Sequence, residues 1–216
     1  MIIRCWGARG SIAVSGREYV KYGGDTPCIE IRTRNDEAII IDAGTGHAFD
    51  IERDIEEMMS QAFAVSDIDA FREELVPGAR LLYLGDNAGE IVFDTVLVRQ
   101  LLERNVDVTY AVKSGPIIND ATMADAEFAG MTELTHVIET GSNDIGVCFG
   151  NASPEFLDAF ASADIVVGKG HGNFETCSGR PENVYFLLKA KCPMVADALG
   201  VEVGDIVFKK NRRPKA

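Results

Sequence analysis

The feature that most constrains the fold is an alternation of apolar, strand-like runs with helical patterns, which begins at residue 79. Six runs have the length and apolar character of buried strands: 79–85, 106–112, 134–140, 163–168, 192–196 and 205–208. The intervening segments predict helices over 88–104, 120–129, 153–161 and 182–190. Strands that alternate with helices pair in parallel and are covered on both faces. We therefore expect an α/β fold, a Rossmann-like three-layer sandwich with a mainly parallel sheet, although no GxGxxG motif is present.

The first 46 residues have a different character, because they are rich in glycine and in short β-like runs. Strand candidates lie at 2–6, 28–34 and 37–44. The Asn35-Asp36 pair predicts a hairpin turn between the last two.

Helical periodicity appears after this region, over residues 51–63, and a second short helix is predicted over 67–75. We therefore divide the chain into a small β-rich N-terminal segment, residues 1–46, and an α/β domain, residues 47–216.

The charge of the chain narrows the choice of partners. The 216 residues carry a formal net charge of −13. Such a surface is repelled by nucleic-acid phosphates, so we expect no nucleic-acid partner. No apolar run reaches the ~18 residues of a membrane span, and the N-terminus lacks the pattern of a secretory signal, so we expect no membrane partner. An anionic substrate would need a metal ion or a local group of lysines.

The cysteines indicate a reduced, cytoplasmic protein. There are five, an odd number, and none forms a CxxC pair, so we expect neither a disulfide framework nor a structural zinc site. Cys5, Cys28 and Cys192 lie in apolar runs and are expected to be buried.

Ligands of such sheets bind beyond the carboxyl ends of the strands, so the loops at these ends are the candidates for a site. Loop 85–90 contains Asp86 and Asn87, and loop 113–122 contains Asp120. Carboxylate and amide oxygens suit Mg²⁺ or Mn²⁺. Both loops also precede predicted helices, so an ordinary helix cap is the alternative interpretation.

Two further loops follow predicted strands. Loop 139–144 is more typical of a polar turn than of a phosphate cradle. In loop 168–175, three glycines alternate with lysine, histidine and asparagine, and its backbone N–H groups with Lys169 are suited to an oxyanion. Lys189 and Lys191 either compensate a helix C-terminus or reach the pocket.

Four stretches resemble the damage-control phosphatase family, also called DUF89 or ARMT1-like: LLYLGDNAGEIVFD, SGPIINDATMADAE, GKGHGNFET and YFLLKAKCPMVADALGVEVGD. The resemblance covers residues from about 47 to 209. It implies metal-dependent hydrolysis of small phosphometabolites such as sugar phosphates, with Mn, Mg, Co or Ni as the divalent cation.

The resemblance also implies site residues. The cation would be held by Asp86, Asn87 and Asp120, which would therefore be the catalytic residues. The phosphorylated substrate would be contacted by Lys169, Gly170, His171, Gly172, Asn173, Phe174, Glu175 and Lys189.

The N-terminal stretches RCWGARGSI, YGGDTPCIEIRT and IIIDAGTG resemble instead the opening strands of metallo-β-lactamase-fold hydrolases. That family's metal site needs an HxHxDH motif, and this chain has only the well-separated His47, His136 and His171. The resemblance therefore implies strands without that metal site, in the place of the larger helical region that damage-control phosphatases carry.

Two functions follow from these observations. The first is a metal-dependent phosphomonoester hydrolase, with Glu90 and Glu175 as the candidates for a general base. The alternative is a catalytically inactive metal- or phosphate-binding domain of a fused or truncated chain. Phosphate release from a small phosphomonoester distinguishes them. The physiological substrate, the preferred cation and the oligomeric state stay open.

Overall fold

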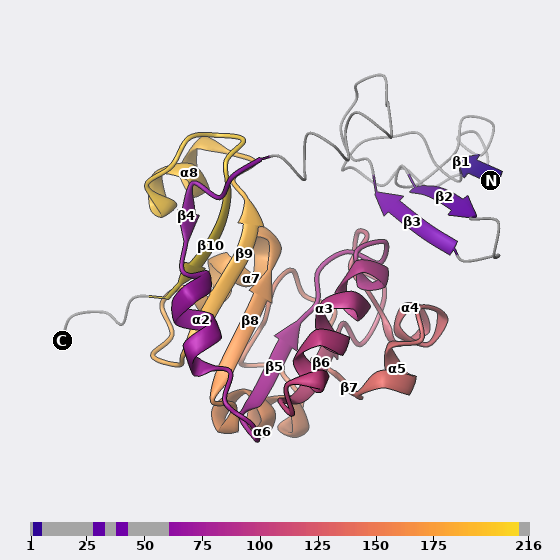
Figure 1. Ribbon diagram of the computed structural model, residues 1–216, viewed down its shortest axis with the longest axis horizontal. Helices are drawn as coiled ribbons and strands as arrows, with labels where there is room; N and C mark the ends of the chain where they lie inside the picture. The colour runs from indigo at the N-terminus through magenta and orange to yellow at the C-terminus, as the bar shows by residue number, and fades with distance from the viewer. Residues whose placement is uncertain (1, 6–27, 33–37, 43–60, 212–216) are drawn as a thin grey trace.

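The computed structural model describes residues 2–5, 28–32, 38–42 and 61–211, with side chains over 61–211 (Figure 1). Most of the predicted helix over 51–63 and the predicted Asn35-Asp36 turn lie outside these described residues.

The N-terminal strands form a small antiparallel sheet. It consists of β1 (Ile2–Cys5), β2 (Cys28–Arg32) and β3 (Ala38–Asp42), in the order β1-β2-β3. The register pairs Ile2 with Arg32 and Cys28 with Asp42. All three strands were expected from the sequence and are confirmed.

The main sheet has seven strands in the order β4-β10-β9-β8-β5-β6-β7. They are β4 (Val65–Ser66), β5 (Arg80–Leu84), β6 (Asp107–Val112), β7 (His136–Glu139), β8 (Ile165–Lys169), β9 (Val184–Lys189) and β10 (Ile206–Lys210). Strands β5 to β9 run parallel to one another, β10 is antiparallel to β9, and β4 is parallel to β10. The expected mainly parallel sheet is confirmed.

Helices cover both faces of this sheet. They are α2 (Ile68–Glu74), α3 (Ile91–Glu103), α4 (Met123–Phe128), α5 (Met131–Leu134), α6 (Pro154–Ser162), α7 (Gly170–Cys177) and α8 (Pro193–Leu199). One buried apolar cluster joins the sheet to α2, α3, α4 and α5, and a second joins its other face to α6, α7 and α8. The predicted three-layer sandwich is therefore confirmed. No helix of the described part is long and apolar enough to cross a membrane.

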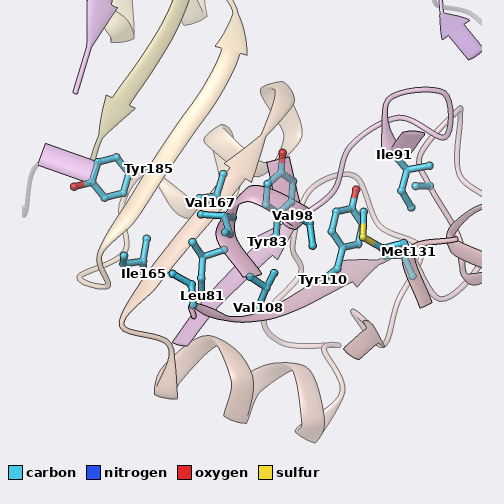
Figure 2. Packing of buried hydrophobic residues seen from close by; sticks show 14 of the residues in the cluster. Leu81, Tyr83, Ile91, Val98, Val108, Tyr110, Met131, Ile165, Val167 and Tyr185 are labelled. Carbon is cyan, nitrogen blue, oxygen red and sulfur yellow. The ribbon is translucent and has the colours of Figure 1, made fainter. Parts of the chain in front are cut away.

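Alternating side chains of strands β5 to β10 enter the two clusters. Leu81 and Tyr83 of β5 join the first, and Leu82 and Leu84 join the second. Figure 2 shows the first cluster, in which the fully buried Tyr83 and Tyr110 point their hydroxyl groups the same way. Their rings are stacked with centroids 5.1 Å apart.

Two of the predicted elements are wrong in type. Residues 182–190, expected as a helix, contain β9, because Val184, Tyr185 and Phe186 are buried between the two helical layers. A short apolar run is ambiguous between helix and strand, and the position between two neighbouring strands decides it.

Residues 192–196, expected as a strand, begin helix α8 instead. Pro193 occupies the start of this helix and Gly200, with a left-handed φ of 75°, ends it, which is the usual proline-to-glycine asymmetry of a helix. Cys192 precedes the helix and is half-buried, so the prediction that it is buried in a strand is also wrong. Cys5 and Cys28 have no described side chains.

The strand order places a topological switch point at β5. From β5 the chain continues through β6 and β7 on one side, then crosses to β8 and β9 on the other. In open α/β sheets, the crevice at the carboxyl ends of such strands is where ligands bind. Here the loop after β5 and the end of β8 meet at this crevice.

Candidate metal and phosphate site

Backbone hydrogen bonds join the loops that follow β5 and β6. The Ala121 N–H donates to the Asp86 carbonyl at 2.8 Å, and the Ala88 N–H donates to the Asn119 carbonyl at 2.8 Å. Asn87 and Asp120 form an antiparallel bridge between the same loops. The structure thus brings Asp86, Asn87 and Asp120 together at the carboxyl edge of the sheet, as the sequence predicts.

The end of β8 closes the site from the other side of β5. Gly170 has a left-handed φ of 75°, and a Cβ atom there would lie 2.8 Å from Oδ1 of Asp86 and nearer still to Oδ2. The buried Asn173 donates from Nδ2 to the carbonyls of Gly85, at 3.2 Å, and Lys169, at 2.8 Å. These contacts hold the first turn of α7 directly against the Asp86 loop.

The charged forms of two carboxylates of the site are disfavoured by their surroundings. Burial, and then the charges of Glu90 and Asp120, raise the pKa of Asp86 to about 7, which Lys169 and Lys191 only partly oppose. Burial also raises the pKa of Asp120, although Lys113 acts against it. A cation between these groups would relieve this repulsion.

The donor set fits a hard divalent cation. Two carboxylates and one amide supply oxygen ligands, and such ligands suit Mg²⁺ and Mn²⁺. Within the described part of the chain, no three His, Cys, Asp or Glu side chains are grouped so as to hold a metal ion. The candidate set therefore depends on the Asn87 amide as its third ligand.

Lys169 lies in the wall of the site. Its side chain is buried, and its ammonium pairs with Glu90 and, at 2.9 Å, with Oδ1 of Asp94. Burial alone would lower the pKa of Lys169, but these two carboxylates raise it. The same lysine lowers the pKa of Glu90 against the opposing effect of burial. The ammonium thus neutralises carboxylates of the protein.

Asp94 is a site residue that sequence reasoning missed. It lies in α3 on the same buried face as Ile91, Val98 and Leu101. The sequence did contain a signal for it, because Asp94 lies at helical spacing among apolar residues and is therefore expected on the buried face of the helix. A charge buried there requires a partner.

Lys113 is a second buried lysine beside the site. Its Nζ donates to the carbonyls of Asp144, at 2.9 Å, and Gly146, and lies 3.6 Å from Oδ2 of Asp120. It therefore ties the Asp120 loop to the loop that follows β7. Lys113 is the first residue of the candidate loop 113–122, and the sequence analysis predicted no role for it.

His171 contacts the linker between β9 and α8. Its Nε2 lies 2.9 Å from the Lys189 carbonyl and 3.0 Å from the Lys191 backbone nitrogen. A single ring nitrogen either donates to the carbonyl or accepts from the N–H, and both arrangements hold this linker against α7. Lys189 and Lys191 are exposed, and the charge of Lys191 lowers the pKa of Asp86.

The other residues of the predicted substrate loop are distributed over α7. A Cβ atom on Gly172 would lie 2.9 Å from the Gly146 nitrogen, so the helix packs closely on that loop. Phe174 contacts Phe186 edge to face, with ring centroids 5.1 Å apart. Glu175 is exposed. The predicted loop 168–175 is thus wrong from residue 170 onward, because these residues belong to helix α7, whose first turn faces the site.

The chain is similar to known damage-control phosphatases. It shares 41% identity over 176 residues with "Damage-control phosphatase PH1575" of Pyrococcus horikoshii, covering 80% of this chain and 61% of that protein. It shares 36% identity over 153 residues with a "Damage-control phosphatase" of Archaeoglobus fulgidus, covering 70% of this chain and 52% of that protein. An uncharacterized protein of Methanocaldococcus jannaschii, MJ0202, is 44% identical over 135 residues, covering 61% of this chain and 44% of that protein.

A solved structure shows the same fold. The crystal structure of the DUF89 family protein from Pyrococcus horikoshii superposes with a TM-score of 0.74 at 41% identity, over 80% of this chain and 61% of that one. The chain spans between 44% and 61% of the length of these relatives. The division at residue 46 stays a prediction.

The family profile of the damage-control phosphatase ARMT1-like domain matches residues 40–207, which include every strand and helix that forms the site. The chain therefore belongs to the damage-control phosphatase ARMT1-like (DUF89) family.

Proposed function

We propose that this chain is a metal-dependent phosphatase that hydrolyses small phosphomonoesters of the sugar-phosphate type. The observation that carries the proposal is the convergence of Asp86, Asn87 and Asp120 at the switch point of the sheet, where burial and the neighbouring carboxylates raise the pKa of Asp86. The names of the relatives from Pyrococcus horikoshii and Archaeoglobus fulgidus support the same activity.

Asp86, Asn87 and Asp120 would hold the cation, and Mn, Mg, Co or Ni are the proposed ions. A bound cation polarises the phosphoryl oxygens and lowers the pKa of a coordinated water. Without it, the carboxylates of Asp86 and Asp120 would both repel an anionic phosphate.

The phosphate would lie against the first turn of α7. The leading N–H groups of a helix have no partner within the helix and attract anions. Gly170 lets this turn approach Asp86 closely. Exposed Lys189 ends β9 and exposed Lys191 lies on the linker that follows, beside His171 of α7, and we propose that these lysines attract the anionic substrate. Lys169, which is buried and paired with Glu90 and Asp94, would act on the phosphate only through the electrostatic attraction of its charge.

Of the two candidates for a general base, Glu90 and Glu175, position favours Glu90 as the residue that contacts the attacking water. Glu90 contacts Asn87 and Lys169 within the site, whereas Glu175 is exposed on α7, beyond the first turn that faces the site. Because Lys169 pairs with Glu90 and keeps its pKa low, Glu90 is suited to orient a water as an acceptor more than to take up its proton at neutral pH.

Phosphate release from p-nitrophenyl phosphate and fructose-1-phosphate tests the activity, with Mn²⁺, Mg²⁺, Co²⁺ or Ni²⁺ added to chelator-treated protein. Asp86→Ala should abolish Mn²⁺ binding measured by calorimetry, together with turnover. Asp164→Ala is the matched control, because Asp164 pairs with Arg80 just before β8, at the opposite edge of the sheet. Equal Mn²⁺ binding by wild type and Asp86→Ala would refute the metal site.

The alternative, a catalytically inactive metal- or phosphate-binding domain, is decided by the same experiment. It predicts that Asp86→Ala loses Mn²⁺ binding while the wild type, loaded with each of the four cations, releases no phosphate from either substrate.

A further inference from the structure

The buried carboxylate of Asp94 joins three strands that end at the site. Asp94 is 4% exposed. Its Oδ1 accepts from the Tyr83 hydroxyl at 2.8 Å and from Lys169 Nζ at 2.9 Å, and its Oδ2 accepts from the Tyr110 hydroxyl at 2.7 Å. The two tyrosines come from β5 and β6 and the lysine from β8. A buried charge with three donors is held in one geometry.

From Asp94, polar contacts continue to the candidate metal ligands. The ammonium of Lys169 pairs with both Asp94 and Glu90. Oε1 of Glu90 accepts from Nδ2 of Asn87 at 2.7 Å, and the same Nδ2 lies 3.3 Å from Oδ2 of Asp86. Asp94, Lys169, Glu90 and Asn87 thus form one continuous chain of contacts.

This chain fixes which end of the Asn87 amide is available to a cation. An amide has a nitrogen that only donates and an oxygen that only accepts. Glu90 and Asp86 both present acceptor oxygens to Asn87, so its nitrogen faces them. A flipped amide would place its oxygen against these two carboxylates, which is repulsive. The oxygen of Asn87 is therefore the atom that remains for a metal ion.

We propose that Asp94 is a positioning residue that, through Lys169 and Glu90, holds the Asn87 amide with its oxygen directed to the cation. The proposal rests on the metal site of the proposed function. Outer residues that orient metal ligands are worth roughly 10–100-fold in metal affinity. Asp94 is separated from the cation by three side chains, so it acts on ligand orientation without contact with the metal or the substrate.

Calorimetric titration of Mn²⁺ into the chelator-treated, full 216-residue chain tests this role. We expect Asp94→Asn to weaken Mn²⁺ binding at least tenfold, and Glu90→Gln to weaken it to a similar extent. Because both changes break the same chain of contacts, the double variant should bind within about twofold of the weaker single variant.

Two control variants separate positioning from a general structural role. Tyr83→Phe removes a hydrogen bond from Asp94 but leaves its pair with Lys169, so it should lower the melting temperature and keep Mn²⁺ affinity within about twofold. Asp164→Asn removes an exposed ion pair with Arg80 and should leave Mn²⁺ affinity unchanged.

Three results would overturn the positioning role: wild-type Mn²⁺ affinity in folded Asp94→Asn, independent losses that multiply in the double variant, or an equal loss in Tyr83→Phe. If Asp94→Asn does not fold, Glu90→Gln decides alone, and unchanged affinity refutes the proposal. A wild type that binds Mn²⁺ without phosphatase turnover overturns the proposed activity only, and the affinity comparison still decides positioning. A wild type that binds no Mn²⁺ overturns both.

Discussion

Gly170 at the start of α7 lies directly against the carboxylate of Asp86, so that a Cβ atom on Gly170 would come within 2.8 Å of Oδ1 and closer to Oδ2. This contact joins the end of β8 to the loop after β5, and it makes the shape of the site depend on the absence of a single methyl group.

Gly170→Ala should therefore abolish Mn²⁺ binding, an effect that backbone strain alone does not produce. Gly200→Ala is its matched control, because Gly200 has the same φ of 75° and a methyl group added there would meet no atom within 4 Å. We expect Gly200→Ala to cost about 1–2 kcal/mol of unfolding free energy and to bind Mn²⁺ normally. Gly170→Ala should lose at least as much stability and also lose Mn²⁺ binding. Equal Mn²⁺ affinity in the two variants would contradict the importance of the contact.

The contribution of Asp86 to the stability of the metal-free protein should fall as the pH rises. The folded-state pKa of Asp86 is raised to about 7 from an ordinary value of 3.8. The unfolded chain therefore ionises first, so this contribution is complete below pH 3.8, is lost progressively between pH 3.8 and about 7, and is absent at higher pH. Asp86→Asn should be more stable than wild type by only about 1 kcal/mol at pH 4.5 and by up to about 4 kcal/mol at pH 8.5.

Chemical denaturation in EDTA at both pH values measures this difference. Adding Mn²⁺ at pH 8.5 should reverse the order, because only wild type gains binding free energy. A wild type that is not destabilised relative to Asp86→Asn at pH 8.5 would show that the charge of Asp86 is already neutralised.

Cys177 should be the least reactive described thiol. Burial raises its pKa to about 11, outweighing the hydrogen bond with Thr176. Because the thiolate is the nucleophile, alkylation by iodoacetamide at pH 8 should modify the half-buried Cys148 and Cys192 well before Cys177. Peptide mass spectrometry resolves the three sites, and unfolding in urea should make their rates similar. Rapid labelling of Cys177 in the folded protein would contradict its burial.

The N-terminus of α6 should depend on Ser153. Its hydroxyl accepts from the Phe156 N–H at 3.1 Å and donates to the Glu139 carbonyl at 3.1 Å, which ties α6 to β7. Ser153→Ala should cost about 1–2 kcal/mol of unfolding free energy. Ser162→Ala, at the exposed end of the same helix, should change it by less than about 0.5 kcal/mol. Thermal unfolding of both variants measures the difference, and similar losses would refute the capping role.

Much of the fold could be predicted from the sequence. The strand–helix alternation after residue 79 determined a mainly parallel sheet with helices on both faces, because apolar strands connected by amphipathic helices bury both faces only in that arrangement. The positions of Asp86, Asn87 and Asp120 at the carboxyl edge were also predictable, because their loops follow neighbouring parallel strands.

The segment from 182 to 190 could not be assigned by local pattern. Its apolar residues fit a helix or a strand equally well, and the position of β9 between β8 and β10 decided the outcome. The next segment did carry local signals for helix α8, in Pro193 and Gly200. Glycines at 170 and 172 disfavour a helix by propensity, but close packing of α7 against Asp86 and Gly146 requires them.

The sequence by itself determined the layered fold and the polar loops at one edge of its sheet, because periodicity and strand-end position are local properties of the chain. Only the tertiary structure decided how the buried charges pair. Lys169 and Asp94 are 75 positions apart in the chain, yet their ammonium and carboxylate lie 2.9 Å apart. No local pattern encodes this pairing, since it arises only when β8 and α3 pack against the same buried tyrosines and each charge must find a partner away from water.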